Sequence, residues 1–399
     1  MTKHSKIRKI IHMDLDAFFC AVEELEQENL KEKPFAVGGK PDERGVVSSC
    51  SYAARRFGVH SAMPMSQALK LCPELVIISP RHALYQKKSE QVMSILQNYS
   101  ALIEQVSIDE AFLDVSDMSE DGDKIAQTIK NQIRSETNLS ASFGIAQNKL
   151  LAKLANDVGK KRYREKNYPG SILLVVNGRE AEFLAPLSVD MLWGVGKKTK
   201  LILMEMGIKT IGDLTKTPLN LLIQKFGKNG ALLSQYANGI DDRPLEVNQD
   251  LKSISQEMTF SKDIMDRDVI RLELMEMSEM IGHRLRAHKV FASTIRLKIR
   301  YADFSTYTRQ VHLSHPVDQD TIIFDTGLKL FNEFWDQRSK IRLIGLSATQ
   351  LVEGFEQLSF WQNEADRERL LLNAVDKLKE KYGKNIVKKA TKLDHKKEK

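Results

Sequence analysis

The chain has 399 residues, 42% of them hydrophobic, and a formal net charge of +7 at pH 7. This length predicts three or four domains with true hydrophobic cores, and the three cysteines lack the even number and the spacing of a disulfide framework or a zinc site. The charged first residues exclude a signal peptide and no apolar run is long enough to cross a bilayer, so we expect a cytoplasmic protein without membrane contact.

Residues 10–25 predict a buried strand that turns directly into a helix. The strand is apolar at Ile10, Ile11 and Met13, and the helix has its apolar positions at Phe18, Ala21, Val22 and Leu25. Asp14 and Asp16 would share one face at the end of this strand. An isolated pair of this kind is also explained by a solvated strand end followed by a helix cap at Asp16. The pair therefore needs acidic partners elsewhere before it indicates chemistry.

Residues 101–115 supply such partners. Their sequence, ALIEQVSIDEAFLDV, predicts a hairpin with Asp109 and Glu110 at its tip. A tight turn or a bulge would bring both carboxylates toward one place. Several acids that converge at strand ends repel one another unless a cation lies between them, and oxygen ligands suit magnesium. The alternative is a polar hairpin tip that faces only water.

The segment 191–214 predicts two helices around a tight turn at Gly194 and Gly196. Consecutive backbone N–H groups at this turn, together with Lys197 and Lys198, would hold a phosphate without reading a base. A glycine pair of this kind is often only a turn, but its surroundings favour a helix-hairpin-helix element that binds DNA non-specifically.

Residues 253–352 predict a second α+β domain. The expected elements are a strand from 253, a helix at 266–289, a strand at 291–301, a strand at 306–313, a helix at 319–336 and a strand at 342–352, which is a ferredoxin-like β-α-β-β-α-β order. On the strand 291–301 the apolar residues alternate with a cationic stripe of Arg296, Lys298 and Arg300. The stripe either protects a sheet edge or contacts the backbone of a duplex.

Three motifs in order, HMDLDAFF, SYAARRFGV and SIDEAFLD, resemble those of the Y-family DNA polymerases, most closely the bacterial DNA polymerase IV branch. The resemblance runs from about residue 10 to about residue 350. It implies a multidomain α+β right hand with a ferredoxin-like palm at 1–175, small fingers inserted at about 30–80 and a helix-hairpin-helix thumb at 176–240. A linker at 241–252, a ferredoxin-like little finger at 253–352 and a tail at 353–399 would follow.

The resemblance also implies an activity. The chain would transfer a deoxynucleotide from a dNTP to a primer 3′-hydroxyl on a DNA template, in low-fidelity translesion synthesis that depends on two Mg²⁺ ions. By this resemblance the metal ligands are Asp14, the backbone carbonyl of Leu15, Asp109 and Glu110, and Asp16 is structural.

The remaining pocket residues follow from the same resemblance. Tyr52, Arg55 and Lys160 would contact the triphosphate, although the run of basic residues leaves Lys161 as an alternative to Lys160. Phe19 would be the steric gate against a ribose 2′-hydroxyl. Phe18 would belong to the core face of its helix.

Residues 357–361, QLSFW, resemble the pentapeptide with which bacterial polymerases bind the sliding clamp. The contacts would come from Gln357, Leu358, Phe360 and Trp361. The alternative is that these residues cover the core of the little finger. Behind them, an amphipathic helix is predicted from Leu371, Val375, Leu378 and Tyr382. The expected partners are thus primer-template DNA, a dNTP and a sliding clamp, and we expect a monomer.

Two other functions share parts of this pattern. A nucleotidyl cyclase also uses a ferredoxin-like palm with acids on a hairpin, but it has no need of a helix-hairpin-helix or of a basic second domain. A non-catalytic DNA-binding repair accessory would explain the basic residues but not the acids at 14, 109 and 110.

Overall fold

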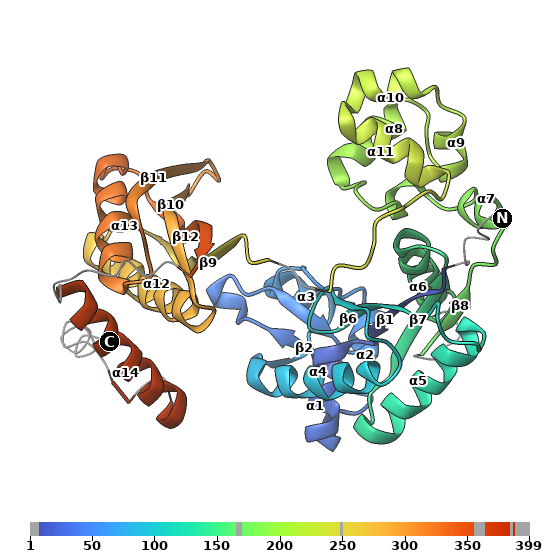
Figure 1. Ribbon diagram of the computed structural model, residues 1–399, viewed down its shortest axis with the longest axis horizontal. Coiled ribbons are helices and arrows are strands. Elements are labelled where there is room, and N and C mark those ends of the chain that lie inside the picture. The colour runs from blue at the N-terminus through green and yellow to red at the C-terminus, as the bar shows by residue number, and fades with distance from the viewer. Residues whose placement is uncertain (1–7, 165–169, 248–249, 355–363, 384–385, 388–399) are drawn as a thin grey trace. The chain divides into compact units, whose positions relative to one another are not determined.

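A computed structural model describes residues 8–164, 170–247, 250–354, 364–383 and 386–387 (Figure 1). The chain divides into two compact units. One unit contains Met1–Pro41 and Gly45–Gln249, and the other contains Asp42–Arg44 and Asp250–Lys399. None of the helices within these described stretches combines the length and the apolar character that crossing a bilayer requires.

The first unit is built around a five-stranded sheet with the order β5-β6-β1-β7-β8. Its strands are β1 (Ile10–Leu15), β5 (Ile103–Gln105), β6 (Glu110–Asp114), β7 (Ala141–Ala146) and β8 (Ile172–Leu174). Strand β1 is central and pairs antiparallel with both β6 and β7. This position explains why β1 and β7 are apolar over nearly their whole length, since helices cover both of their faces.

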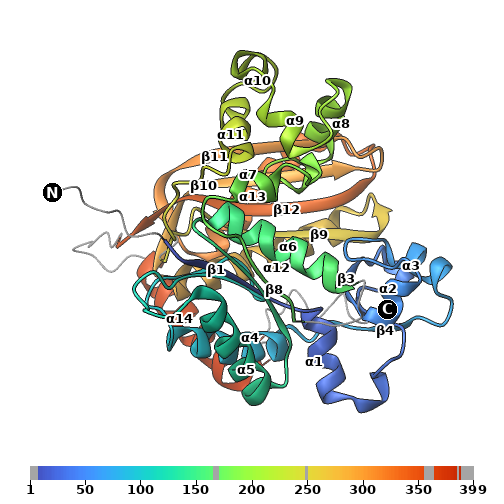
Figure 2. The ribbon, with the colours of Figure 1, turned by 90° about the vertical axis from the view of Figure 1, so that its right-hand side faces the viewer.

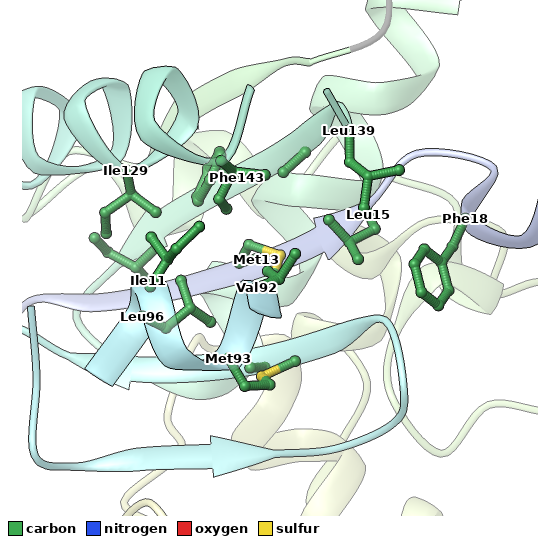
Figure 3. Close-up of a cluster of buried hydrophobic side chains, with 14 of the residues drawn as sticks. Ile11, Met13, Leu15, Phe18, Val92, Met93, Leu96, Ile129, Leu139 and Phe143 are labelled. Atoms are coloured by element: carbon green, nitrogen blue, oxygen red, sulfur yellow. The ribbon is translucent and has the colours of Figure 1, made fainter. Parts of the chain in front are cut away.

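Helices α4 (His82–Gln97) and α5 (Gly122–Thr137) pack on one face of this sheet. Figure 3 shows part of the core that these helices form with the sheet, which includes Met13 and Leu15 of β1 and Val92 and Leu96 of α4. This strand and the helix that follows it, α1 (Phe18–Glu26), confirm the periodicity read from residues 10–25.

Helix α6 (Lys149–Arg164) covers the opposite face, along β1 and β7 (Figure 2). It approaches β7 very closely at Gly144, where an added Cβ would lie 2.0 Å from the carbonyl oxygen of Ala152. Only glycine permits this contact, and the close approach sets α6 against the same sheet face as Asp14.

Two smaller substructures complete the first unit. A three-stranded sheet, β3-β2-β4, contains β2 (Phe35–Gly38), β3 (Val47–Cys50) and β4 (Val76–Ile78), and it carries α2 (Tyr52–Arg56) and α3 (Met65–Leu71). A helical group contains α7 (Glu180–Leu184), α8 (Lys197–Glu205), α9 (Ile211–Thr215), α10 (Leu219–Phe226) and α11 (Lys228–Ala237). The apolar residues of this group join the core beneath α6.

The turn at Gly194 differs in one respect from the expectation. Helix α8 begins at Lys197 directly after the glycines, but the element before them is a 3-10 turn, Val189–Met191, instead of a full helix. An isolated β-bridge between Ser188 and Thr210 holds the chain extended there, which leaves no room for a longer helix. Gly194 has a φ of 91°, which favours glycine.

The second unit confirms the predicted β-α-β-β-α-β order. It contains β9 (Ser253–Ile264), α12 (Arg267–Ala287), β10 (Val290–Tyr301), β11 (Thr306–Val317), α13 (Asp320–Phe334) and β12 (Ile341–Glu353). The sheet order is β11-β10-β12-β9, so β12 lies between the two strands that α12 connects. Apolar residues of both helices and of the covered sheet face form one core.

Helix α14 (Glu364–Tyr382) follows the second unit's last strand and confirms the predicted C-terminal helix. Charged side chains make several of its contacts within this unit. The carboxylate of Asp376 accepts a hydrogen bond from Nε of Arg286 on α12 at 2.6 Å. Three of the four residues from which the helix was predicted are exposed, namely Leu371, Leu378 and Tyr382. The helix therefore packs through polar residues and turns much of its apolar side to solvent.

Candidate active site

The end of β1 and the tip of the predicted hairpin meet in the sheet. Asp14 on β1 lies opposite Glu110 on β6, and the backbone N–H of Leu15 donates to the carbonyl oxygen of Asp109 at 2.9 Å. The Ser107 hydroxyl in the turn donates to Oδ1 of Asp109 at 2.6 Å. Antiparallel pairing thus places Asp14, near the end of β1, beside Asp109 and Glu110 at the start of β6.

Asp16 does not cap the following helix, so that explanation of the residue is wrong. The N-cap of α1 is Ala17, which has a left-handed conformation and makes no side-chain cap bond. Asp16 is 5% exposed and accepts hydrogen bonds from the hydroxyls of Ser140, at 2.9 Å, and Ser142, at 2.8 Å. Its carboxylate therefore fixes the β1 end against β7.

A polar pocket opens at this end of the sheet. It is lined by acids of the sheet, by the start of α1, by the fingers-like α2 and by α6, including Asp14, Leu15, Phe19, Tyr52, Arg55, Asp109 and Lys160. Side chains from four separated parts of the sequence thus converge in one place. The Glu110 side chain is not among the residues that line this pocket.

Helix α6 presents a polar stripe to the acids of the sheet. Its members, spaced by four, three and four residues, are Lys149, Lys153, Asn156 and Lys160. Each lysine has its own acid: Lys149 binds Glu104, Lys153 binds Glu110 and Lys160 binds Asp14. Positions at this spacing lie on one side of a helix, so the three lysines reach acids on three successive strands, β5, β6 and β1.

The pKa values of Asp14 and Glu110 are shifted in opposite directions. Burial raises the pKa of Asp14 to about 6, against the effect of Lys160 and with that of the nearby Asp109 and Glu110. Burial also acts to raise the pKa of Glu110, but hydrogen bonds and charges from His12 and Lys153 outweigh it and lower this pKa to about 2. Burial therefore favours the neutral form of the Asp14 carboxyl even though Lys160 binds it.

The acids are not grouped as a ligand set around a common point. Within the described ranges, no three His, Cys, Asp or Glu side chains are close enough together to hold one metal ion. Asp14 and Glu110 each contact a lysine of α6 instead. Their chemistry nevertheless suits a hard divalent cation, because all the donors are oxygens.

The two phenylalanines have the different environments that the resemblance implied. Phe18 is 2% exposed and belongs to the core. Phe19 lies at the pocket edge, and its ring stacks on Tyr85 of α4 with centroids 4.3 Å apart. The Tyr85 hydroxyl donates to the buried carboxylate of Glu23 at 2.6 Å.

Tyr52 and Arg55 share one face of α2, as their spacing predicted. Ser51 caps this helix by accepting from the backbone N–H of Ala54. The Arg55 guanidinium lies 5.2 Å from the Tyr52 ring centre, and its Nε donates to the carbonyl oxygen of Cys50 at 3.2 Å. Both side chains reach the pocket, whereas Lys161 is exposed and does not line it.

The other predicted residues that the structure describes are not among those that line this pocket. Gly194 and Gly196 precede α8, which begins with the exposed Lys197 and Lys198. On β10 the basic residues alternate with buried ones, as expected, and each has a polar partner: Arg296 binds Gln310, Lys298 binds Glu257 and Arg300 binds Thr306. Residues 357–361 lie outside the described part of the chain.

Three side chains at the site were missed in the sequence. His12 and Lys153 bind Glu110, and Tyr85 supports Phe19. A signal existed for the first two, because His12 shares the strand face of Asp14 and Lys153 lies two helical turns before Lys160. No local pattern pointed to Tyr85.

The sequence of the chain is similar to those of known proteins over nearly its whole length. The DNA polymerase IV of Dehalococcoides mccartyi is 40% identical over 381 residues, which cover 94% of this chain and 95% of that protein. The chain belongs to the DNA polymerase IV family. The DNA polymerase IV of Bacillus velezensis is 36% identical over 395 residues, or 96% of this chain and 93% of that protein.

Sequence profiles agree with membership of the DNA polymerase IV family. The impB/mucB/samB family matches residues 13–157, and its C-terminal domain matches residues 251–360. A profile described as the DNA polymerase-iota thumb domain matches residues 190–241.

Solved structures place this chain among the Y-family enzymes. A Y-family DNA polymerase chimera is 26% identical with a TM-score of 0.75, and it covers 87% of this chain and all of its own. DinB from Sulfolobus solfataricus is 25% identical with a TM-score of 0.58, and the match covers 87% of this chain and 100% of that chain. The right-hand fold inferred from the motifs is thereby confirmed.

As a member of this family, the chain is a DNA-directed DNA polymerase of the translesion class. Membership of the family implies that catalysis depends on a divalent metal ion. The cyclase and accessory alternatives are accordingly set aside.

Proposed function

We propose that the pocket at the end of β1 binds an incoming dNTP with two Mg²⁺ ions and transfers the deoxynucleotide to the 3′-hydroxyl of a primer. One observation carries the proposal. Acids of the sheet, an aromatic ring of α1, the Tyr52 and Arg55 pair and Lys160 line the same pocket. In-line phosphoryl transfer needs such positioning and charge neutralisation more than it needs a covalent nucleophile.

In this proposal Asp14, Asp109, Glu110 and the backbone carbonyl of Leu15 hold the metal ions. The support is chemical, because these are oxygen donors at the end of β1 and at the start of β6. When bound, the ions activate the primer hydroxyl and neutralise the charge of the leaving pyrophosphate. Asp16 then acts structurally, through its bonds to Ser140 and Ser142.

Tyr52, Arg55 and Lys160 would bind the triphosphate. The two residues of α2 offer a hydroxyl and a guanidinium side by side, and Lys160 offers an ammonium from α6. The pocket lining supports Lys160 over Lys161. Phe19 would exclude ribonucleotides, because its stacked ring has little freedom to move away from a 2′-hydroxyl.

The DNA would be held outside this pocket. Gly194, Gly196, Lys197 and Lys198 present a turn and a helix N-terminus suited to a phosphate, and Arg296, Lys298 and Arg300 suit a duplex backbone. We also propose the palm, fingers, thumb, linker, little finger and tail boundaries given by the resemblance. We further propose that the protein is a monomer and that residues 357–361 contact a sliding clamp.

A primer-extension assay tests the proposal directly. The full chain should add templated deoxynucleotides in Mg²⁺, on intact templates and opposite a lesion, and EDTA should stop the reaction. Glu110→Ala should abolish extension. A folded, DNA-bound protein that adds no nucleotide, or a Glu110→Ala variant that extends normally, would contradict the proposed site.

A further inference from the structure

His12 lies on the same face of β1 as Asp14, two residues earlier, and its side chain is fully buried. Its Nε2 is 2.5 Å from Oε1 of Glu110. The ammonium group of Lys153 binds the same oxygen atom from α6. Among the described residues, no side chain or backbone group forms a hydrogen bond with the other oxygen, Oε2.

We propose that His12 and Lys153 are positioning residues that hold the Glu110 carboxylate by Oε1 and thereby present Oε2 for metal binding. This inference rests on the proposed assignment of Glu110 as a metal ligand. A glutamate side chain has several rotatable bonds, and ordering it costs free energy when a ligand must do so alone. Two donors on one oxygen lower that cost in advance.

The direction of the hydrogen bond follows from Asn156. The Nδ2 atom of Asn156 lies 3.1 Å from the carbonyl oxygen of Ser142, 3.4 Å from the carbonyl oxygen of His12 and 2.9 Å from the ring atom Nδ1 of His12. Backbone carbonyls only accept, so the amide nitrogen must face them and also donates to Nδ1. In the neutral ring the proton is then on Nε2, which donates it to Glu110.

The surroundings keep the imidazole in this orientation. The ring of Phe112 packs against it with centroids 4.6 Å apart, and Asn156 closes its other side. Such outer partners of a metal ligand fix its direction and contribute to metal affinity. A His that served only the core would contribute to folding stability and would leave metal affinity unchanged.

Substitution of Lys153 gives the sharper test, because an effect of its charge and an effect of its positioning role would change metal affinity in opposite directions. Its ammonium repels a metal ion and competes for Glu110, so removal of the charge alone would tighten metal binding. Removal of a positioning hydrogen bond would weaken it. The side chain is 30% exposed, so Lys153→Met is expected to fold.

The experiment uses the full chain bound to a primer-template that ends in a dideoxynucleotide, together with the next dNTP. Mn²⁺ is titrated and its binding is followed by electron paramagnetic resonance. In Lys153→Met and in His12→Phe, one Mn²⁺ should bind about 10- to 100-fold more weakly, the usual cost of removing such a partner. DNA affinity should be unchanged. Lys124→Met, at an exposed pair on α5, is the matched control.

A double-mutant comparison assigns the effect to Glu110. In a Glu110→Ala background neither substitution should weaken Mn²⁺ binding further, because the carboxylate that they position is absent. Unchanged or tighter Mn²⁺ binding in folded Lys153→Met overturns the inference, whether or not His12→Phe folds. An equal weakening in the Glu110→Ala background overturns it as well. If Glu110→Ala itself binds both ions normally, the proposed ligand set fails instead.

Discussion

The ring of Phe19 stacks on the ring of Tyr85, with centroids 4.3 Å and planes 15° apart. The Tyr85 hydroxyl is anchored on Glu23, whose carboxylate also binds Arg81. Phe19 is thus backed by a fixed surface in the core of the first unit. A ring held in this way discriminates by shape, since it cannot yield to an additional hydroxyl group.

Phe19→Ala should therefore admit ribonucleotides. We expect the preference for dNTP over NTP to fall by roughly 100-fold, the scale on which a fitted pocket rejects one additional group. The measurement is the ratio of kcat/KM for the two sugars in single-nucleotide insertion. Phe57→Ala, at an exposed aromatic side chain, is the control and should keep the parent ratio. An unchanged ratio in Phe19→Ala would leave Phe19 as a packing residue only.

Asp109→Ala should remove catalysis while leaving DNA binding nearly intact, because the proposed role of the acids is to bind the metal ions and that of the basic residues is to bind DNA. A loss of several kcal/mol of transition-state stabilisation corresponds to a rate at least about 10³-fold lower. Single-turnover extension and fluorescence anisotropy of labelled DNA measure the two properties. Asp123→Ala, an exposed acid on α5, is the control. Near-parental extension by Asp109→Ala would end its assignment as a ligand.

Local patterns predicted the elements of the site but not its internal contacts. The strand and helix of residues 10–25, the hairpin at 101–115 and the alternation on β10 each depend on neighbours in sequence, so periodicity was enough. The bond between His12 and Glu110 joins residues 98 positions apart and depends on strand register. Register is set by the packing of both sheet faces, and a single sequence does not display it.

Exposure of the apolar residues on α14 shows a second limit of pattern reading. Their spacing correctly predicted a helix, but spacing does not state which face packs. The contact is made instead by Asp376, because Arg286 is buried and requires carboxylates. Asp376 thus adds a second carboxylate to the buried guanidinium of Arg286, which already binds Asp320.

Changing Arg296, Lys298 and Arg300 together to alanine should weaken duplex binding regardless of sequence. The log–log salt dependence should flatten by roughly one unit for each phosphate that the variant no longer neutralises. Lys298 makes two 2.9 Å contacts with Glu257, so its charge is already partly neutralised. Glu257→Gln should accordingly strengthen binding. The check is anisotropy over a range of salt concentrations, and an unaltered slope in the triple variant would mean that the stripe faces only water.

Changing Leu358, Phe360 and Trp361 together to alanine should remove stimulation by the sliding clamp on a long template. Distributive synthesis on a short primer should persist, because tethering acts only by raising the local concentration of the enzyme on DNA. Leu370 and Leu371 are 70% and 62% exposed, and their change to alanine is a matched apolar control. Clamp stimulation that survives the triple change in a folded protein would exclude this peptide as the tether.

Arg286→Met should destabilise the second unit by about 3–5 kcal/mol, because it leaves buried carboxylates without their cation. Arg286 is 5% exposed, and Nη1 donates to Oδ1 of Asp320 at 2.9 Å while Nε donates to Asp376 at 2.6 Å. Urea unfolding followed by circular dichroism measures the change. Lys329→Met breaks an exposed pair with Glu333 and should cost less than about 1 kcal/mol. Equal effects of the two substitutions would show that burial adds nothing to the Arg286 contacts.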